Sequence, residues 1–479
     1  MRKEFEVQYE LGCERIEEIS IPEKSRDELP PVLRALQFIF TTPSISKQVF
    51  EILNDKILSN VKKTGCYGMT LWEILVFACV RLTLDSDYDR LHYTSNYDSL
   101  VRSLLGISKF AGSQKEYSLQ ALKDNIALLD EETIEKINEL VVNESHKRFS
   151  ITELNAKIDS YVFETNVHFP TDLNLLWDAI RKSIDLVSQL SQALELDGWR
   201  KHKDWQDRLR IYFLNASKSC KGAGKNSAKG QHAVLEYLST AQDLNKKLIE
   251  TINELKTIAD LSGCSSNKFN KLIYFQNHID KHIDLVRRRL IYKEQIPHEE
   301  KVFSLFEPHT EWIKKGKVRN QVELGVRIAI ASDQFGFILD HRVMEQEQDV
   351  DIAVPFLQEL LLKKTLKSVS FDKGFWSVTN FNSLKDYVEN LIMPKKGKLN
   401  KIEKEREQSK SFRQLRRKHS AVEASINCLE HHGLNRCPDK GVDNFKRYTA
   451  LGVLAYNLHK LGNLLSAQSN MELLELCKN

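Results

Sequence analysis

The sequence predicts an α/β protein: a mixed sheet with flanking helices, preceded by an α-helical N-terminal domain and interrupted by a helical insertion. Three observations predict this class. Segments that predict strands, rich in β-branched and aromatic residues, begin after about residue 150, where amphipathic helical segments alternate with them. Helical periodicity dominates the first 150 residues. A second purely helical block, at 172–297, separates the first strand from the other strands.

The composition is that of a soluble globular chain. It has 479 residues, 41% of them hydrophobic, which is enough for about three domains at roughly 150 residues each. Lys and Arg (70) exceed Asp and Glu (66) by only 4, so any affinity for nucleic acid must come from local patches. The eight cysteines form no CxxC pair, and no segment has the apolar length of a signal peptide or membrane span. We therefore expect reduced thiols and a cytoplasmic location, without membrane partners.

The first 150 residues predict short helices. The expected ranges are 69–84, 88–92, 98–105 and a pair at 119–142 that breaks around Asp130. Such a series is typical of a DNA-binding helical domain, but equally of a plain bundle or a dimerisation module.

Strands and helices then follow in a defined order. The segment 157–169 predicts a strand, and the turn Asp333–Gly336 joins two strands into a hairpin. In the helical block we expect helices at 173–196, 233–261 and 268–293. The other expected elements are the hairpin strands 321–331 and 337–344, a helix at 352–363 with Pro355 in its first turn, a strand at 367–372, a helix at 380–387, a strand at 388–393, and helices at 419–432 and 443–465.

Without the helical block, the order is strand, strand, strand, helix, strand, helix, strand, helix. This order is the one found in ribonuclease-H-like nuclease cores. We therefore predict a ribonuclease-H-like catalytic core made of residues 151–171 and 298–470. Residues 172–297 form the helical insertion, at a surface turn that tolerates it, and residues 1–150 form the helical N-terminal domain.

Three acids fall where such a core needs them. Asp159 lies in the first strand, Asp372 ends the strand after the hairpin and its helix, and Glu423 lies on the helix after the last strand. Phosphodiester cleavage by in-line displacement uses two divalent ions about 4 Å apart, and Mg²⁺ and Mn²⁺ prefer carboxylate ligands. The alternative is structural, because single acids at such positions are commonly helix caps or solvated side chains.

Several longer segments resemble DDE transposases of bacterial insertion sequences, and the ISNCY family most closely. They are MTLWEILVFACVRLTL (69–84), IDSYVFETNVHFPTDLNLLWDAIRK (158–182), SLFEPHTEWIKKGK (304–317), VELGVRIAIASDQFGFILDHRVME (322–345), FDKGFWS (371–377), IMPKKGK (392–398) and LRRKHSAVEASINCLEHHGLNRCPDKG (415–441). By position, the resemblance makes Asp159, Asp372 and Glu423 the catalytic triad and the ligands of two Mg²⁺ (or Mn²⁺) ions.

The resemblance also implies an activity. Such an enzyme cuts DNA at the terminal inverted repeats of its element, and the freed 3′ hydroxyl then attacks target DNA. Its partners are double-stranded DNA, at element ends and target, and further copies of itself, as a dimer or larger assembly on the nucleoid. Arg416, His419 and Glu430 depart from the Tyr, Arg, Glu, Lys signature of such enzymes, so the resemblance leaves the end chemistry open, including whether a hairpin forms.

A basic segment precedes Glu423. Between residues 395 and 418, eleven Lys and Arg stand against three Glu. A patch of this kind beside a metal site would bind DNA phosphates, whereas the alternative is a solvated charged loop. The residues we expect to contact DNA are Lys395, Lys396, Lys398, Arg416, Arg417, Lys418 and His419.

Other patterns have less specific explanations. Basic and aromatic residues occur together at 199–229. This composition is typical either of a segment that contacts DNA and stacks on its bases, or of the core of the insertion. Glu164, His168 and Asp172 are candidates for orienting the metal ligands. The cysteines and histidines at 428–437 lack the paired spacing of a zinc site. Two other functions stay open: a catalytically silent DNA-binding regulator derived from a transposase, and a host nuclease on the same core.

Overall fold

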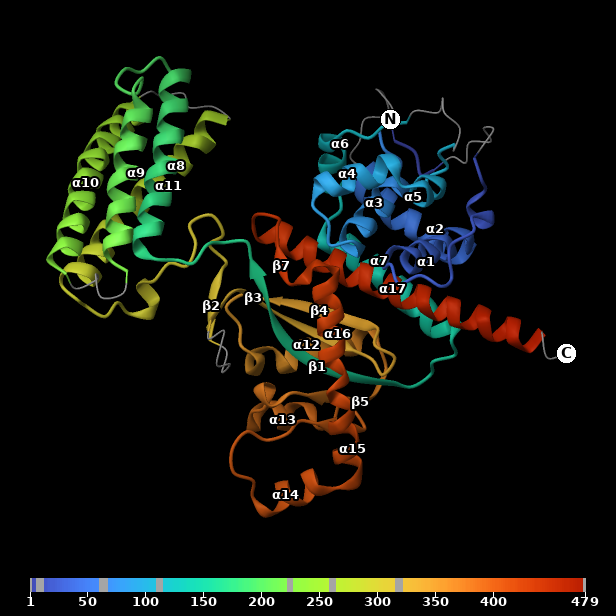
Figure 1. The fold of residues 1–479 in the computed structure, drawn as a ribbon. Coiled ribbons are helices and arrows are strands. Elements are labelled where there is room, and N and C mark those ends of the chain that lie inside the picture. Colours follow the sequence, from blue (N-terminus) through green and yellow to red (C-terminus); the bar gives the residue numbers. More distant parts are fainter. Residues whose placement is uncertain are drawn as a thin grey trace. The chain divides into compact units, whose positions relative to one another are not determined.

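The computed structural model describes residues 2–5, 13–59, 68–108, 115–221, 227–257, 264–314 and 322–476. The chain forms two compact units. One joins Met1–Asn166 to Ile313–Asn479, and the other is Val167–Trp312. The first unit holds a mixed sheet of seven strands, counted over the described residues, with helices flanking it (Figure 1), which makes the chain a mixed α/β protein.

The N-terminal residues are helical, and they pack in the same unit as the sheet. Apolar residues of the helices and of the sheet, such as Leu36, Val80 and Ile330, belong to one hydrophobic core. Every residue of α3 is buried, so this helix lies at the centre of the helical layer. The helices are α1 (Leu29–Thr41), α2 (Pro43–Leu53), α3 (Leu71–Thr83), α4 (Tyr88–Tyr97), α5 (Ser99–Leu104), α6 (Leu119–Ile126) and α7 (Glu131–Arg148).

The helices α3 to α7 each begin at a residue whose side chain caps them. Thr70 and Glu73 form a capping box at the start of α3, and the carboxylate of Asp130 accepts a hydrogen bond from the backbone N–H of Thr133 in α7. The predicted break around Asp130 is therefore the N-cap of α7. The helices α1 and α2 were not predicted.

The sheet is built around β1. Its order is β2-β3-β1-β5-β6, with β4 also paired to β3 and β7 also paired to β1. β1 is antiparallel to β3, β3 is antiparallel to β4, and β1, β5 and β6 are parallel. The strands are β1 (Leu154–Thr165), β2 (Glu311–Lys314), β3 (Val322–Ser332), β4 (Ile338–Met344), β5 (Leu366–Phe371), β6 (Asn390–Ile392) and β7 (Arg436–Cys437).

The helices that follow the hairpin differ from the predicted ones in two places. Pro355 lies inside α12 rather than in its first turn, because this helix begins at Asp349. Much of the basic segment 395–418 forms two helices, α14 and α15, instead of a loop. The bounds are α12 (Asp349–Lys363), α13 (Val378–Leu384), α14 (Lys401–Gln408), α15 (Lys410–His419), α16 (Ala421–Leu429) and α17 (Val442–Leu476).

The second unit is a set of helices around its own apolar core. They are α8 (Asp172–Ala193), α9 (His202–Ser219), α10 (Ala228–Thr257) and α11 (Cys264–Val286). The predicted insertion at 172–297 lies within this unit, which extends further at both ends, and α9 was not predicted. Along the described parts of the chain, no helix combines the length and apolarity that a membrane span requires.

Candidate active site

Asp159 and Asp372 lie side by side at one end of a parallel strand pair. Ile158 of β1 is paired with Phe371 of β5 in the parallel register. Asp159 follows Ile158, and Asp372 follows Phe371, so the two aspartates come at the same level of the two neighbouring strands. Ser370, two residues before Asp372, hydrogen bonds to His419 of α15, which shows that α15 covers this face. Two acids that are 213 positions apart in the sequence thus become neighbours.

Asp159 is the most electrostatically perturbed acid of this site. Burial raises the pKa of its carboxyl, and the charges of Asp372, Asp349 and Glu423 raise it further, whereas a hydrogen bond from the backbone N–H of Ser160 opposes them. The result is a pKa of about 7. Acids from three other parts of the chain therefore act on one half-buried carboxylate.

Asp372 is held by Arg416 of α15. The Nη2 of Arg416 lies 3.0 Å from Oδ1 of Asp372, and its Nη1 donates to the carbonyl of Phe371, also at 3.0 Å. Burial alone would raise the pKa of Asp372, but the hydrogen bonds from Arg416 and from the backbone of Lys373 outweigh it and lower this pKa.

Glu423 lies in the first turn of α16, which packs against β1. Val422 and Leu429 are buried on the inner side of α16, and Ile426 is partly buried. The Glu423 side chain is exposed, and its negative charge contributes to the raised pKa of Asp159.

Asp349 is an acid that sequence reasoning missed. It begins α12 and accepts a hydrogen bond from the hydroxyl of Ser160 at 2.6 Å. A Cβ added at Gly374 would lie only 2.5 Å from its Oδ2, so this glycine leaves room for the carboxylate. An acid in the first turn of a helix is commonly explained by its favourable interaction with the helix dipole, and no local signal shows that the charge of Asp349 acts on Asp159.

The structure places His419 inside the site rather than on the predicted DNA-contacting surface. It is 5% exposed, and its Nδ1 lies 2.9 Å from the hydroxyl of Ser370. Burial, aided by the charge of Arg416, lowers its pKa to about 4. A neutral, buried ring cannot serve as a cationic phosphate contact, so His419 is removed from the predicted DNA-binding residues.

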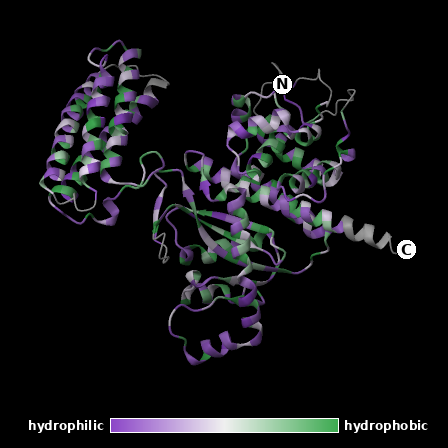
Figure 2. Ribbon diagram, viewed as in Figure 1, coloured by the Kyte–Doolittle hydropathy of each residue, from purple (hydrophilic) through white to green (hydrophobic). Residues whose placement is uncertain are grey.

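The other predicted DNA-binding residues fall into two groups. Arg416 is engaged with Asp372, and Lys395 forms an ion pair with Glu403 at 2.8 Å. The rest are exposed, and no acid of the described chain lies within ion-pair distance of them; they are Lys396, Lys398, Arg417 and Lys418. Figure 2 shows the hydrophilic character of α14 and α15. Lys396 and Lys398 precede α14, and Arg417 and Lys418 lie near the end of α15.

Two of the residues proposed to orient the metal ligands have other partners. His168 lies 2.6 Å from Asp178, and Asp172 lies 2.7 Å from Arg289. All four residues belong to the second unit. These pairs therefore stabilise the helices of that unit, and they are not part of the group of acids around Asp159.

The mixed aromatic and basic segment of the second unit is divided between core and surface. Trp199 is 3% exposed and its indole N–H donates to the hydroxyl of Thr251. Trp205 is only partly buried, and the guanidinium of Arg208 lies 4.1 Å from its ring centre, beside a pocket of about 540 Å³. Trp199 is therefore part of the core, as one alternative for this segment predicted, whereas contact between DNA and the other residues stays a prediction.

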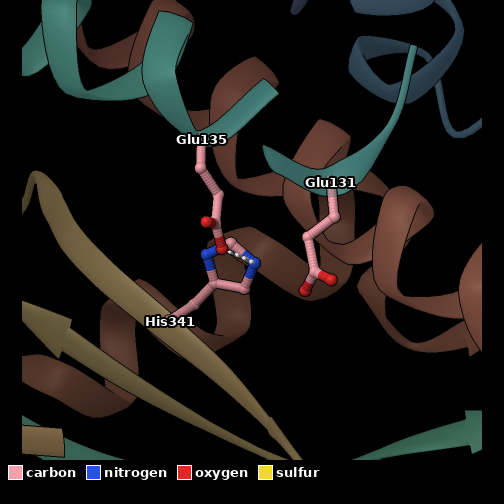
Figure 3. A group of neighbouring side chains, drawn as sticks. All are labelled: Glu131, Glu135 and His341. Carbon is pink, nitrogen blue, oxygen red and sulfur yellow. Dashed lines mark ion pairs between the residues drawn. The ribbon is translucent and has the colours of Figure 1, made fainter. Parts of the chain in front are cut away.

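A separate group of possible metal ligands lies elsewhere in the first unit. Glu131, Glu135 and His341 converge there (Figure 3), and this is the one such group among the residues that the structure describes. It does not involve the cysteines and histidines at 428–437.

Comparison with known protein families, with curated proteins and with solved structures returns no match for this chain.

Proposed function

We propose that this chain is a metal-dependent enzyme that cleaves DNA phosphodiesters. More specifically, we propose a DDE transposase, which cuts and joins strands at the terminal inverted repeats of an insertion sequence. The observation that carries the proposal is the juxtaposition of Asp159 and Asp372 across parallel strands, with Glu423 close enough to act on Asp159.

The strand arrangement supports a ribonuclease-H-like core. The strands β1, β3 and β4 form an antiparallel series, and β5 and β6 continue the sheet on the other side of β1, parallel to it. The spatial order β4-β3-β1-β5-β6 follows from these pairings. It is what we expect if the three consecutive strands of the predicted core form a meander and the later strands arrive through helical crossovers.

The negative charge around Asp159 supports the proposal of a divalent-cation site. Burial and three neighbouring acids raise the pKa of Asp159 to about 7, which is an electrostatic cost that cations bound among these carboxylates would remove. Asp159, Asp372 and Glu423 would hold Mg²⁺ or Mn²⁺ ions, since these prefer oxygen ligands. When bound, such ions stabilise charge on the attacking and leaving oxygens of the phosphate.

The protein's own side chains would prepare the site and the substrate. Arg416 anchors the end of β5 and keeps Asp372 ionised, because its guanidinium donates to that carboxylate. His419, neutral and hydrogen-bonded to Ser370, is buried where α15 packs against β5. The free cations Lys396, Lys398, Arg417 and Lys418 would bind the DNA backbone, which is a sequence-independent contact.

The proposed partners are double-stranded DNA and further copies of this chain. A transposase must hold two element ends together, so we propose a dimer or larger assembly on DNA. A catalytically silent regulator would bind ends without nicking them, and a host nuclease would cut DNA of any sequence.

The test is strand cleavage by the full chain on DNA that carries the sequences flanking its gene, with Mg²⁺. We expect nicks at inverted repeats, lost in Asp372→Asn and retained in Asp386→Asn, an exposed aspartate after α13. Cleavage by Asp372→Asn at the wild-type rate would refute the proposed chemistry. Equal cleavage of unrelated DNA ends would indicate the nuclease, and end binding without nicks would indicate the regulator.

A further inference from the structure

Two glutamates of α7 and one histidine of β4 form a compact cluster. Glu131 and Glu135 are four residues apart, so their side chains lie on the same face of the helix. His341 projects toward them from β4, on the side of β3 that is away from β1 (Figure 3). One ligand atom from each of the three residues lies within 4.8 Å of the others.

This spacing is close to that of a metal site. Zinc binds histidine nitrogen and carboxylate oxygen at about 2.0–2.2 Å, which places the ligands of one ion roughly 3.5 Å from one another. The two glutamates are only partly buried. Rotation of their side chains can therefore bring the three ligand atoms together around one ion without movement of the backbone.

The ring of His341 provides the second, independent observation. The residue is 7% exposed, and its Nε2 is buried without a hydrogen-bond partner among the described residues. Oε1 of Glu135 lies 3.8 Å from this nitrogen, which is too far for a hydrogen bond. A buried ring nitrogen left unpaired costs about 1–3 kcal/mol, so native proteins rarely keep one without a use for it.

The acids around this cluster already have cationic partners. Arg342 pairs with Glu347 and Glu359, Lys446 with Glu345, and Lys363 with Asp340. By contrast, no Lys or Arg of the described ranges lies within ion-pair distance of Glu131 or Glu135. Lys446 and Lys363 affect them only at longer range, and burial together with neighbouring acids still raises the pKa of both glutamates.

The structural alternative accounts for one of the three residues. Glu131 is in the first turn of α7, where an acid interacts favourably with the helix dipole. That explanation does not reach Glu135, which lies a turn further along, or the unpaired nitrogen of His341.

We propose that Glu131, Glu135 and His341 bind one divalent transition-metal ion of the Zn²⁺ class. An imidazole ligand favours such ions over Mg²⁺, which prefers oxygen ligands alone. The neutral form of histidine is the one that coordinates a metal. The cluster borders a pocket of about 430 Å³, which leaves room for water as a fourth ligand. The ion would tie the start of α7 to β4, and so join the helical layer to the sheet.

The test is a Zn²⁺ titration of the full chain carrying Asp159→Asn and Asp372→Asn, in which calorimetry and equilibrium dialysis measure the bound metal. These two substitutions remove two of the three ligands proposed for the other metal site, Asp159 and Asp372, so the result does not depend on the proposed DNA cleavage. We expect about one bound Zn²⁺ per chain, a higher melting temperature with Zn²⁺ and no comparable effect of Mg²⁺.

Glu135→Gln should weaken Zn²⁺ binding at least tenfold, since loss of even an outer-shell partner costs about 10- to 100-fold. His341→Gln should weaken binding by a similar factor. If His341→Gln does not fold, Glu135→Gln alone still decides the test. The matched control is Glu359→Gln, which alters an acid of the same pocket that pairs with Arg342. Absence of bound Zn²⁺, undiminished binding in Glu135→Gln, or equal loss in Glu359→Gln would overturn the proposal.

Discussion

Arg416 and Asp372 form an ion pair in which Nη2 lies 3.0 Å from Oδ1, while the same guanidinium donates to the carbonyl of Phe371. One arginine of α15 therefore holds both the last residue of β5 and the acid that follows it. This geometry needs the planar fork of arginine, because its two N–H groups bind different acceptors at fixed separation.

We expect Arg416→Lys to reduce cleavage although it retains the positive charge. An ammonium can pair with Asp372 or with the Phe371 carbonyl, but it cannot hold both in the same geometry. The site is partly exposed, so the free energy of unfolding should fall by only about 1 kcal/mol. Cleavage rates and urea unfolding measure the two effects. The neighbouring exposed Arg417→Lys is the control, and an equal loss of cleavage in both variants would contradict this role.

The raised pKa of Asp159 predicts that the metal-free protein becomes less stable as the pH rises. Its pKa is about 7 in the folded chain, above its ordinary value of 3.8. A raised carboxyl pKa means that the folded state binds the proton more tightly, so this contribution to stability is present at low pH and is lost as the pH rises toward 7. Asp159→Asn removes the contribution.

We therefore expect the unfolding free energy of Asp159→Asn to exceed that of the wild type at pH 8 in a chelator, by up to a few kcal/mol. The difference should shrink toward pH 4. Urea unfolding at several pH values measures it, with Asp386→Asn as the control that shows no such trend. A wild-type protein that is more stable than Asp159→Asn at pH 8 without metal would contradict this electrostatic account.

The same carboxyl links metal binding to pH. Metal ligands must be deprotonated, so a cation that binds Asp159 competes with a proton held with a pKa of about 7. The Mg²⁺ concentration that gives half-maximal cleavage should therefore fall as the pH rises from about 6 to about 8. Cleavage assays across both variables measure this, and a requirement independent of pH would contradict it.

The exposed cations near Glu423 should govern DNA affinity without sequence preference. Each lost phosphate contact reduces the slope of log affinity against log salt by about 0.9. The double variant Arg417→Gln/Lys418→Gln should bind every duplex more weakly, with a slope reduced by roughly 2. The matched control is Lys385→Gln/Lys440→Gln, two exposed lysines outside this segment. Equal effects of the two double variants would show that 395–418 has no special role.

A buried ion pair is expected to secure the core of the first unit. Arg81 of α3 is 2% exposed, and its two terminal nitrogens lie 2.7 and 3.2 Å from the carboxylate of Asp439. Asp439→Ala leaves the guanidinium buried without its main partner, so we expect a loss of about 3–5 kcal/mol. Chemical denaturation measures it. The exposed Asp443→Ala is the control, and similar stabilities of the two variants would contradict the role of the pair.

Much of the fold could be predicted from local patterns. Alternating apolar residues located β3 and β4, and the polar cluster between them located their turn, because strand pairing with one buried face requires that alternation. Asp130 and Thr70 mark helix starts because their side chains cap backbone N–H groups. The short strands β2 and β7 were missed, since a few residues carry little periodic signal. The longer α9 was missed because only Leu209 and Ala216 are buried on it, which leaves a weak apolar pattern.

The candidate site was predictable only in part. Asp159, Asp372 and Glu423 could be chosen because their elements have a recognisable order along the chain. Asp349 could not, because an acid at a helix start has an ordinary structural explanation. His419 was misplaced for a related reason: its position in a basic segment suggested the surface, whereas the packing of α15 against β5 buries it.

The sequence by itself determined which segments are helices and strands and where the acids stand within them, because periodicity and capping are local properties. Only the tertiary structure decided the parallel register that aligns Asp159 with Asp372, the grip of Arg416 on that acid, and the approach of His341 to α7. It also decided that residues 1–150 share one core with the sheet. These relationships join residues far apart in the chain, and their geometry depends on how whole layers pack, which no local pattern encodes.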